Sequence, residues 1–252
     1  KSSAECSKRR QSPRLYEFSN IFYGRMSSSR PATLYTALEL MALTVGIFVV
    51  AIVAGVVFIV PLVALGYGIE TTFVLVGSTA VGQLAMFALG YGYRRYRSVS
   101  VPVAVPSLRQ VGFVVGGVIA AVMLAIGLSL LLATLGLLPG SVIGDTATTN
   151  PTFLLGLAAL SVLVVAPVEE FVFRGVVQGR LRAAFGPVPA IVGASLLFGS
   201  LHLANYSGNP VSVVAGALMI AAVGSVFGTL YELSDNLAVP VLVHAIYNVI
   251  LL

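Results

Sequence analysis

Long apolar runs separated by short polar segments dominate the chain from residue 34 onward. A helix needs about 20 apolar residues to cross the hydrocarbon core of a membrane. Most of these runs reach or approach that length. We therefore predict transmembrane helices over these ranges: 34–60, 71–92, 110–137, 152–185, 188–204, 210–231 and 238–252.

Two prolines mark points where helices should stop or bend. Pro61 follows the first apolar run, where it predicts a helix end or a kink. The fourth run, 152–185, is too long for one simple span, so Pro167 is its predicted break. Depending on that break, we predict seven to eight transmembrane helices in an all-α, polytopic membrane bundle.

Composition agrees with this pattern and narrows the class of protein. The chain is 58% hydrophobic and 9% charged, whereas soluble domains carry about 25% charged residues. Its mean hydropathy is +1.01. The single cysteine, Cys6, excludes a disulfide framework and a thiolate metal cluster. Small residues four positions apart favour close helix crossings, and the predicted helices contain three glycine pairs of this kind: Gly112/Gly116, Gly175/Gly179 and Gly224/Gly228.

Charge divides the chain into regions and gives it an orientation. Residues 1–30 are polar and basic and are predicted to be a disordered tail, followed by motif-free helices over 31–150 and a motif-bearing region over 151–252. Apart from Arg174, the remaining basic residues cluster at 94–109 and 180–182. Cytoplasmic flanks carry such an excess of Lys and Arg. We therefore expect an integral protein of the plasma membrane with a cytoplasmic N-terminus, and no nucleic-acid partner.

Three polar clusters interrupt the apolar runs of the last region. The first is Glu169-Glu170-x-x-x-Arg174, the second Phe198-x-x-x-His202, and the third His244-x-x-x-Asn248. Ionisable residues at membrane depth are expensive and are functional candidates by default.

The helical spacing separates the roles of the two glutamates. Glu170 and Arg174 are spaced i, i+4 and can pair on one face. Glu169 then lies on another face without a matched cation, where it can act as a general base. Peptide hydrolysis needs a base that activates water and hydrogen-bond donors that stabilise an oxyanion. A basic Glu, two His and an Asn can supply these groups.

Together the three clusters resemble the motifs of the CPBP (Abi) intramembrane proteases, which include the type II CAAX prenyl endopeptidases. The resemblance covers about residues 150–252. It implies a membrane endopeptidase in which Glu169 and His202 activate water while His244 and Asn248 form the oxyanion site. Glu170, Arg174 and Phe198 would support them. The implied partners are the bilayer and a peptide or lipidated (CaaX-type) protein substrate.

Metal dependence has two alternatives. Glu169, His202 and His244 could form a three-ligand zinc site, as the label metalloprotease implies for this family. A zinc site of this kind usually needs a separate base, and the HExxH pattern that supplies one is missing. We favour a metal-independent mechanism without a cofactor.

Two other functions compete with proteolysis. A transporter would string polar groups along a proton path, and Gln83 is the main midspan candidate outside the clusters. A non-catalytic immunity or membrane-assembly protein would keep the site without using it.

The predicted helices place two of the candidate site residues at different depths in the membrane. At about 1.5 Å per residue, Glu169 lies about 25 Å from residue 152, whereas His202 lies about 22 Å from residue 187 at the opposite membrane face. These depths disagree unless Pro167 breaks its helix, the helices tilt, or the topology differs.

Overall fold

Helices account for nearly the whole of the chain that is described. The computed structural model describes residues 30–142, 144 and 149–252. Within this part, six helices are long and apolar enough to cross a membrane, and one shorter apolar helix follows. The prediction of an all-α, polytopic membrane bundle is therefore confirmed. The predicted disordered tail, 1–30, lies outside the described residues except for Arg30.

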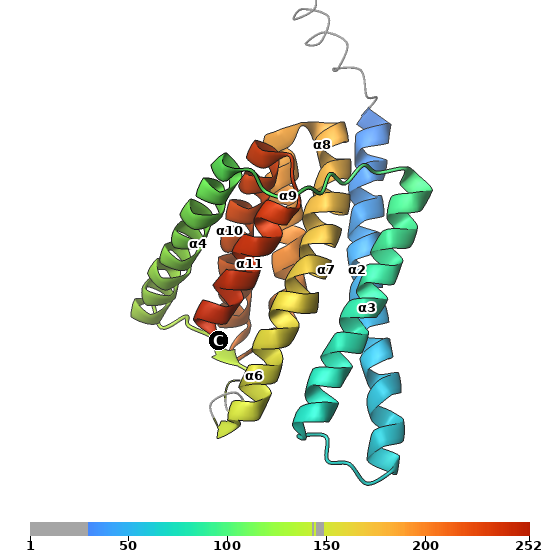
Figure 1. Ribbon diagram of the computed structural model, residues 1–252, viewed down its shortest axis with the longest axis vertical. Helices are drawn as coiled ribbons and strands as arrows, with labels where there is room; N and C mark the ends of the chain where they lie inside the picture. Colours follow the sequence, from blue (N-terminus) through green and yellow to red (C-terminus); the bar gives the residue numbers. More distant parts are fainter. Residues whose placement is uncertain (1–29, 143, 145–148) are drawn as a thin grey trace, which may run out of the picture.

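The elements follow one another in a simple order (Figure 1). They are α2 (Arg30–Ala64), α3 (Thr72–Arg97), α4 (Leu108–Thr134), β1 (Gly140–Ser141), α6 (Pro151–Leu160), the π-helix η1 (Ser161–Val165), α7 (Ala166–Glu170), the π-helix η2 (Phe171–Gln178), α8 (Gly179–Phe185), α9 (Pro187–Leu201), the 3₁₀ helix η3 (His202–Asn205), β2 (Tyr206–Ser207), α10 (Pro210–Ser234) and α11 (Ala238–Leu251).

Local sequence explains where several helices begin. Proline occupies the first turn of α6, α9 and α10, where its missing N–H is not needed. The side chains of Asn150 and Asn209 accept hydrogen bonds from the backbone N–H of Phe153 and Ser212, which caps α6 and α10. At the start of α4, Ser107 forms a capping box with Gln110.

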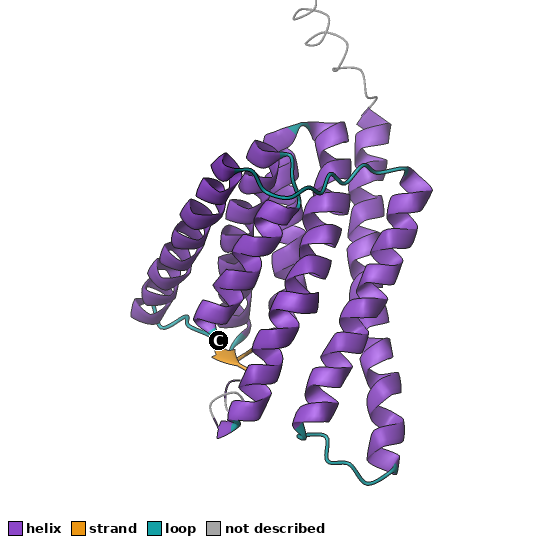
Figure 2. Cartoon of the chain, in the orientation of Figure 1, coloured by secondary structure: helices purple, strands orange, loops and turns teal. Residues whose placement is uncertain are grey.

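The helices form two groups on either side of a long central helix. The α2–α3 hairpin packs along one side of this central helix, whereas α4 packs against α10 and α11 on the other side (Figure 1). The short strands β1 and β2 pair in antiparallel fashion at one end of the bundle, shown in orange in Figure 2.

The predicted break at Pro167 is wrong. Residues 151–185 run as one helix through α6, η1, α7, η2 and α8, without an interruption. A proline ring clashes with the carbonyl four residues earlier, which here belongs to Leu163. Leu163 lies in η1, where the wider π-turn accommodates the proline instead of a break. Pro61 likewise lies inside α2, which continues to Ala64.

The predicted glycine contacts have different outcomes. A side chain at Gly224 would meet Phe198 and Arg174, and one at Gly228 would meet Gln178, so this pair does allow α10 to approach η2 closely. Gly175 and Gly179 instead face the loop residues Val101 and Val99. Cβ atoms at Gly112 and Gly116 would meet nothing within 4 Å.

Candidate active site

The two glutamates lie near the middle of the long helix 151–185. Both belong to α7 and are buried, Glu169 at 9% and Glu170 at 0% relative exposure. Gly186, with φ of 84°, turns the chain sharply between α8 and α9. Glu169 precedes this turn and His202 follows it, and the number of residues that separates each of them from Gly186 is nearly the same. The two residues therefore lie at similar depth, and the length of the helix 151–185, not a break at Pro167, resolves the conflict.

Glu170 and Arg174 form the predicted ion pair. Arg174 Nε lies 3.2 Å from Glu170 Oε2, and both side chains are fully buried. The guanidinium lies 4.8 Å from the Phe198 ring centroid and donates from Nη2 to the carbonyl of Gly224 at 3.2 Å. This cation is therefore paired and packed within the protein, as a buried charge requires.

Glu170 also forms a contact with His244 that the sequence did not predict. Glu170 Oε1 lies 2.8 Å from His244 Nδ1. An ionised carboxylate only accepts hydrogen bonds, so Nδ1 carries the proton and a neutral His244 keeps a lone pair on Nε2. The ring stacks on Phe227 at 4.9 Å between centroids. Glu170 thus sets both the tautomer and the orientation of His244.

Glu169 lies at the end of this chain of contacts. Its Oε2 is 3.8 Å from His244 Nε2, which is too far for a direct hydrogen bond. Its Oε1 accepts a hydrogen bond of 3.0 Å from Gln83 Nε2 on α3. Gln83 was not predicted as part of the catalytic site, although its polar amide in an apolar helix was a signal that could have identified it.

The four predicted catalytic residues line one cavity of about 630 Å³. Glu169, His202, His244 and Asn248 all contribute to its wall, together with Gln83. The rest of the lining comes mainly from apolar residues of α2, α3, α6 and α11. A mostly apolar cavity with a few convergent polar groups is typical of a substrate site.

His202 and Phe198 form a unit at the end of α9. His202 Nδ1 lies 3.0 Å from the carbonyl oxygen of Phe198, which can only accept. The two rings meet edge to face, with centroids 4.7 Å apart. Phe198 also contacts the rings of Phe173 and His244. His202 is therefore fixed through Nδ1, which leaves Nε2 as the nitrogen available to the cavity.

The alternative zinc site would need three neighbouring ligands. In the part of the chain that the structure describes, no group of three or more His, Cys, Asp or Glu side chains is arranged to hold a metal ion. Of the alternative ligand set, His244 Nε2 and Glu169 Oε2 lie 3.8 Å apart.

One family model matches the region of the chain that carries the candidate site. Residues 150–250 match the model of the family described as type II CAAX prenyl endopeptidase Rce1-like. This match confirms the resemblance to CAAX proteases for that part of the chain, and it indicates a peptide hydrolase of the CAAX intramembrane type. No curated protein and no solved structure matches the chain.

Proposed function

We propose that Glu169 activates water for the cleavage of a peptide bond. The premise is the match of residues 150–250 to the type II CAAX prenyl endopeptidase family. One observation carries the proposal. The Glu169 carboxylate lies in the wall of the cavity, where one oxygen accepts a hydrogen bond from Gln83 and the other faces His244 Nε2 across 3.8 Å.

The gap between Glu169 and His244 suits a water molecule. A water bound there can donate one hydrogen to Glu169 Oε2 and the other to the lone pair of His244 Nε2. Both acceptors hold the oxygen with its own lone pair free for attack. This arrangement favours His244, rather than His202, as the partner of Glu169 in water activation.

The reaction then follows ordinary general acid–base chemistry. Glu169 takes a proton from water while the water oxygen bonds to the substrate carbonyl carbon. A tetrahedral intermediate forms, and its oxyanion needs hydrogen-bond donors. The amide of Asn248 supplies N–H donors, and His202 Nε2 supplies another when the ring is protonated. Glu169 finally returns the proton to the amide nitrogen as the C–N bond breaks.

Glu170, Arg174 and Phe198 support this chemistry without touching the substrate. Arg174 balances the charge of Glu170, and Glu170 keeps His244 in the tautomer with a free Nε2. Phe198 packs against Arg174, His202 and His244. We propose that the substrate is a membrane-associated or lipidated peptide, including CaaX-type peptides, and that the protein resides in the plasma membrane with a cytoplasmic N-terminus.

Replacing Glu169 with Gln tests the proposal directly. The purified protein is assayed in detergent against a peptide library with farnesylated and unmodified members. Loss of general-base catalysis lowers kcat by about 10²- to 10⁴-fold. Glu169→Gln keeps the size of the side chain and one acceptor oxygen, but it removes the basic carboxylate. The matched control is Glu232→Gln, because Glu232 accepts a hydrogen bond from Gln178 and neither residue belongs to the cavity lining. Full cleavage by Glu169→Gln would refute the mechanism.

A further inference from the structure

A cluster of arginine side chains lies where the end of α3 meets α2 and α8. Its members are Arg94, Arg95 and Arg97 of α3 and Arg180 of α8, and we call them the arginine cluster. Glu39 of α2 pairs with two of them. Its Oε1 lies 2.6 Å from Arg97 Nε, and its Oε2 lies 3.6 Å from Arg180 Nη2. These ion pairs provide one carboxylate for the four cations of the cluster.

The excess positive charge belongs to Arg94 and Arg95. Neither of them forms an ion pair within the part of the chain that the structure describes. Arg94 donates from Nε to the carbonyl oxygen of Val99 at 3.2 Å, and Arg95 is exposed. A guanidinium carries five N–H donors, so most donors of these two side chains remain available to an anion. Arginine can bind a phosphate group through two such donors at once.

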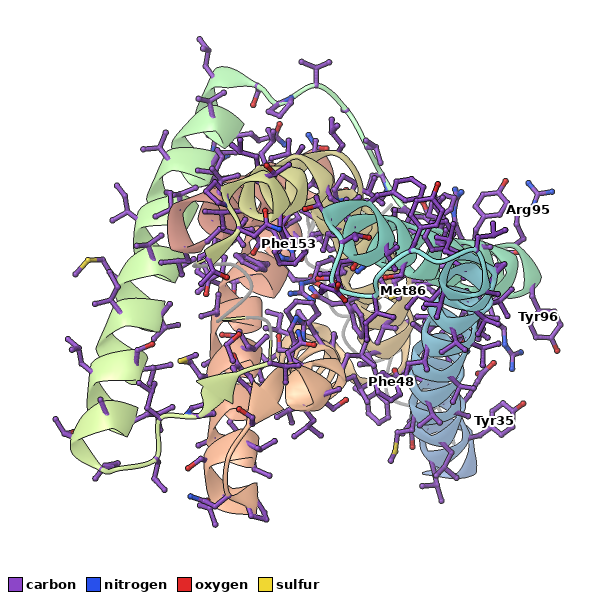
Figure 3. All side chains as sticks on the ribbon, turned by 90° about the horizontal axis from the view of Figure 1, so that it is seen from below. Tyr35, Phe48, Met86, Arg95, Tyr96 and Phe153 are labelled. Carbon is purple, nitrogen blue, oxygen red and sulfur yellow. The ribbon has the colours of Figure 1, made fainter. Side chains whose placement is uncertain are left out.

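The depth and the neighbours of the arginine cluster are those of lipid headgroups. The helix α3 has 26 residues, whereas about 20 cross the hydrocarbon core, so its last turn extends beyond the core. Tyr96 and Tyr35 are 75% and 60% exposed, and tyrosine is enriched at the membrane–water interface. The Arg97 guanidinium lies 4.9 Å from the Tyr96 ring centroid and donates from Nη2 to Tyr35 Oη at 3.3 Å. In Figure 3, Tyr35, Arg95 and Tyr96 lie along one outer edge of the bundle.

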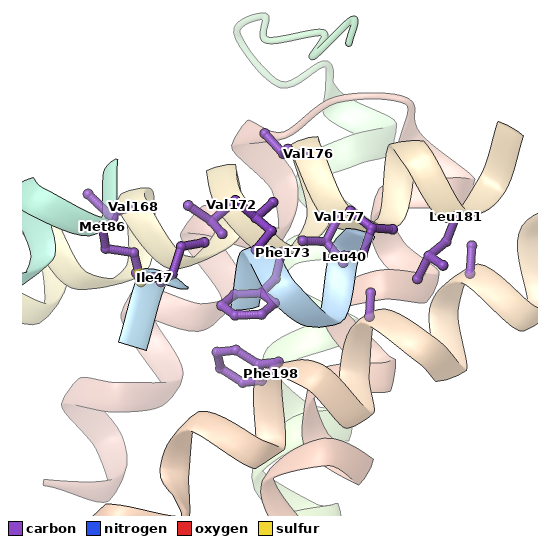
Figure 4. Close-up of a cluster of buried hydrophobic side chains, with 13 residues drawn as sticks. Leu40, Ile47, Met86, Val168, Val172, Phe173, Val176, Val177, Leu181 and Phe198 are labelled. Atoms are coloured by element: carbon purple, nitrogen blue, oxygen red, sulfur yellow. The ribbon is translucent and has the colours of Figure 1, made fainter. Parts of the chain in front are cut away.

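The helix α2 has a packed face and an unpacked face beside the arginine cluster. On the packed face, Leu40 belongs to a buried hydrophobic cluster with the long helix, and Figure 4 shows it beside Val177. On the unpacked face, three apolar side chains follow Tyr35 at spacings of three or four residues, and each is more than half exposed: Leu38, Met41 and Val45. Residues at these spacings share one side of a helix. An apolar strip therefore runs from the arginine cluster into the membrane-spanning part of α2.

We propose that the arginine cluster binds the headgroup of an anionic phospholipid. Arg94 and Arg95 donate to its phosphate oxygens, and the acyl chains lie along the apolar strip of α2. The inference is independent of the proposed function, because neither Glu169 nor the cavity takes part in it. The alternative is a purely local role, since arginines in the last turn of a helix interact favourably with the helix dipole. That role predicts no selectivity between lipids.

Lipid binding to the purified protein tests the proposal without any assay of proteolysis. Native mass spectrometry in detergent measures the dissociation constants of phosphatidylglycerol and of phosphatidylcholine with the same acyl chains. We expect the anionic lipid to bind more tightly than the zwitterionic one. Arg95→Gln should weaken the binding of phosphatidylglycerol about 5-fold, and Arg94→Gln combined with Arg95→Gln about 25-fold, from the usual contribution of one arginine at an anionic lipid surface. Thermal unfolding in lipid-free detergent checks that each variant is folded.

Arg109→Gln is the matched control. Arg109 is also exposed, but it lies at the start of α4 against the ring of Phe113, outside the arginine cluster. This variant should bind phosphatidylglycerol as the unmodified protein does. Equal weakening by Arg109→Gln and Arg95→Gln would reveal a diffuse effect of charge and overturn the site, as would equal binding of the two lipids.

Soluble glycerol 3-phosphate separates a lipid from a free phosphate as the ligand. It presents the same phosphate chemistry without acyl chains, so it cannot contact the apolar strip of α2. We expect it not to displace phosphatidylglycerol when the two are present at equal concentration. Displacement at equal concentration would show that the arginine cluster takes a small phosphate compound, and the assignment to a lipid would be overturned.

Discussion

The region 151–252 and the α2–α3 hairpin contribute to the site in different ways. The former carries all three motifs and, by itself, links Arg174 to Glu170 and Glu170 to His244. The hairpin carries no motif, yet it forms the facing wall of the cavity and supplies Gln83. The motif region therefore builds the charged framework, whereas the hairpin completes the surroundings of the residue proposed to act as base.

This difference means that the motifs alone describe an incomplete site. The charged framework depends on contacts between the long helix, α10 and α11, and it should fail when one of its ions is removed. The hairpin contact is a single hydrogen bond to Glu169, and its loss should change the rate while the fold persists. Three predictions test this contrast, in order of decreasing effect.

Arg174→Met should destabilise the protein most strongly. Removing one partner of a buried ion pair costs about 3–5 kcal/mol, because the other charge stays buried without compensation. Here Glu170 would lose the cation 3.2 Å away, and Met keeps most of the volume between Phe198 and Phe227. Thermal unfolding in detergent measures the change.

The control for this variant is Arg182→Met. Arg182 pairs with Glu232 at 3.1 Å, but its side chain is 50% exposed. Exposed pairs contribute about 0–1 kcal/mol. If Arg174→Met unfolded at the same temperature as Arg182→Met, the charged framework would not have the structural role assigned to it.

Gln83→Leu should slow cleavage and leave the fold intact. A hydrogen bond to a charged group contributes about 1.5–3 kcal/mol, so its loss from Glu169 should lower kcat by about 10- to 100-fold. KM should change little, since the amide acts on Glu169 rather than on the bound peptide. Steady-state kinetics of the variant separates the two parameters, and thermal unfolding checks the fold.

Thr79→Ala is the matched control for Gln83. Thr79 lies one turn away on α3, lines the same cavity, and bonds the carbonyl of Leu75 instead of Glu169. Equal losses of kcat in the two variants would show that any change in this wall disturbs catalysis, and the specific role of Gln83 would be withdrawn.

The sequence predicted the number and positions of the helices better than it predicted where a helix breaks. Each apolar run corresponds to a helix, because run length and hydropathy decide whether a segment can span a membrane. The behaviour of Pro167 was predicted wrongly, since a π-turn around Leu163 depends on how neighbouring helices hold the backbone. The apparent conflict in depth between Glu169 and His202 had another origin, because depth was counted from residue 152 although the helix 151–185 is longer than a single span needs.

The candidate site was predictable as a set of residues but not as a network. The i, i+4 spacing of Glu170 and Arg174 is a local property, so their pairing followed from the sequence alone. The bonds of His244 to Glu170 and of Gln83 to Glu169 join residues 74 and 86 positions apart. Such contacts depend on which helix faces which, and no spacing rule within one helix gives that information.

Chelation should have the smallest effect, and it tests whether the charged framework serves a metal instead of a water. The tautomers of His244 and His202, both bonded through Nδ1, would also suit metal ligands, whose second nitrogen commonly bonds a carboxylate or a carbonyl. The arrangement nevertheless lacks a third neighbouring ligand among the described residues. We therefore expect cleavage to persist at the same rate in a strong chelator. Loss of cleavage that zinc restores would make Glu169, His202 and His244 ligands, and Glu169 could then no longer be the base.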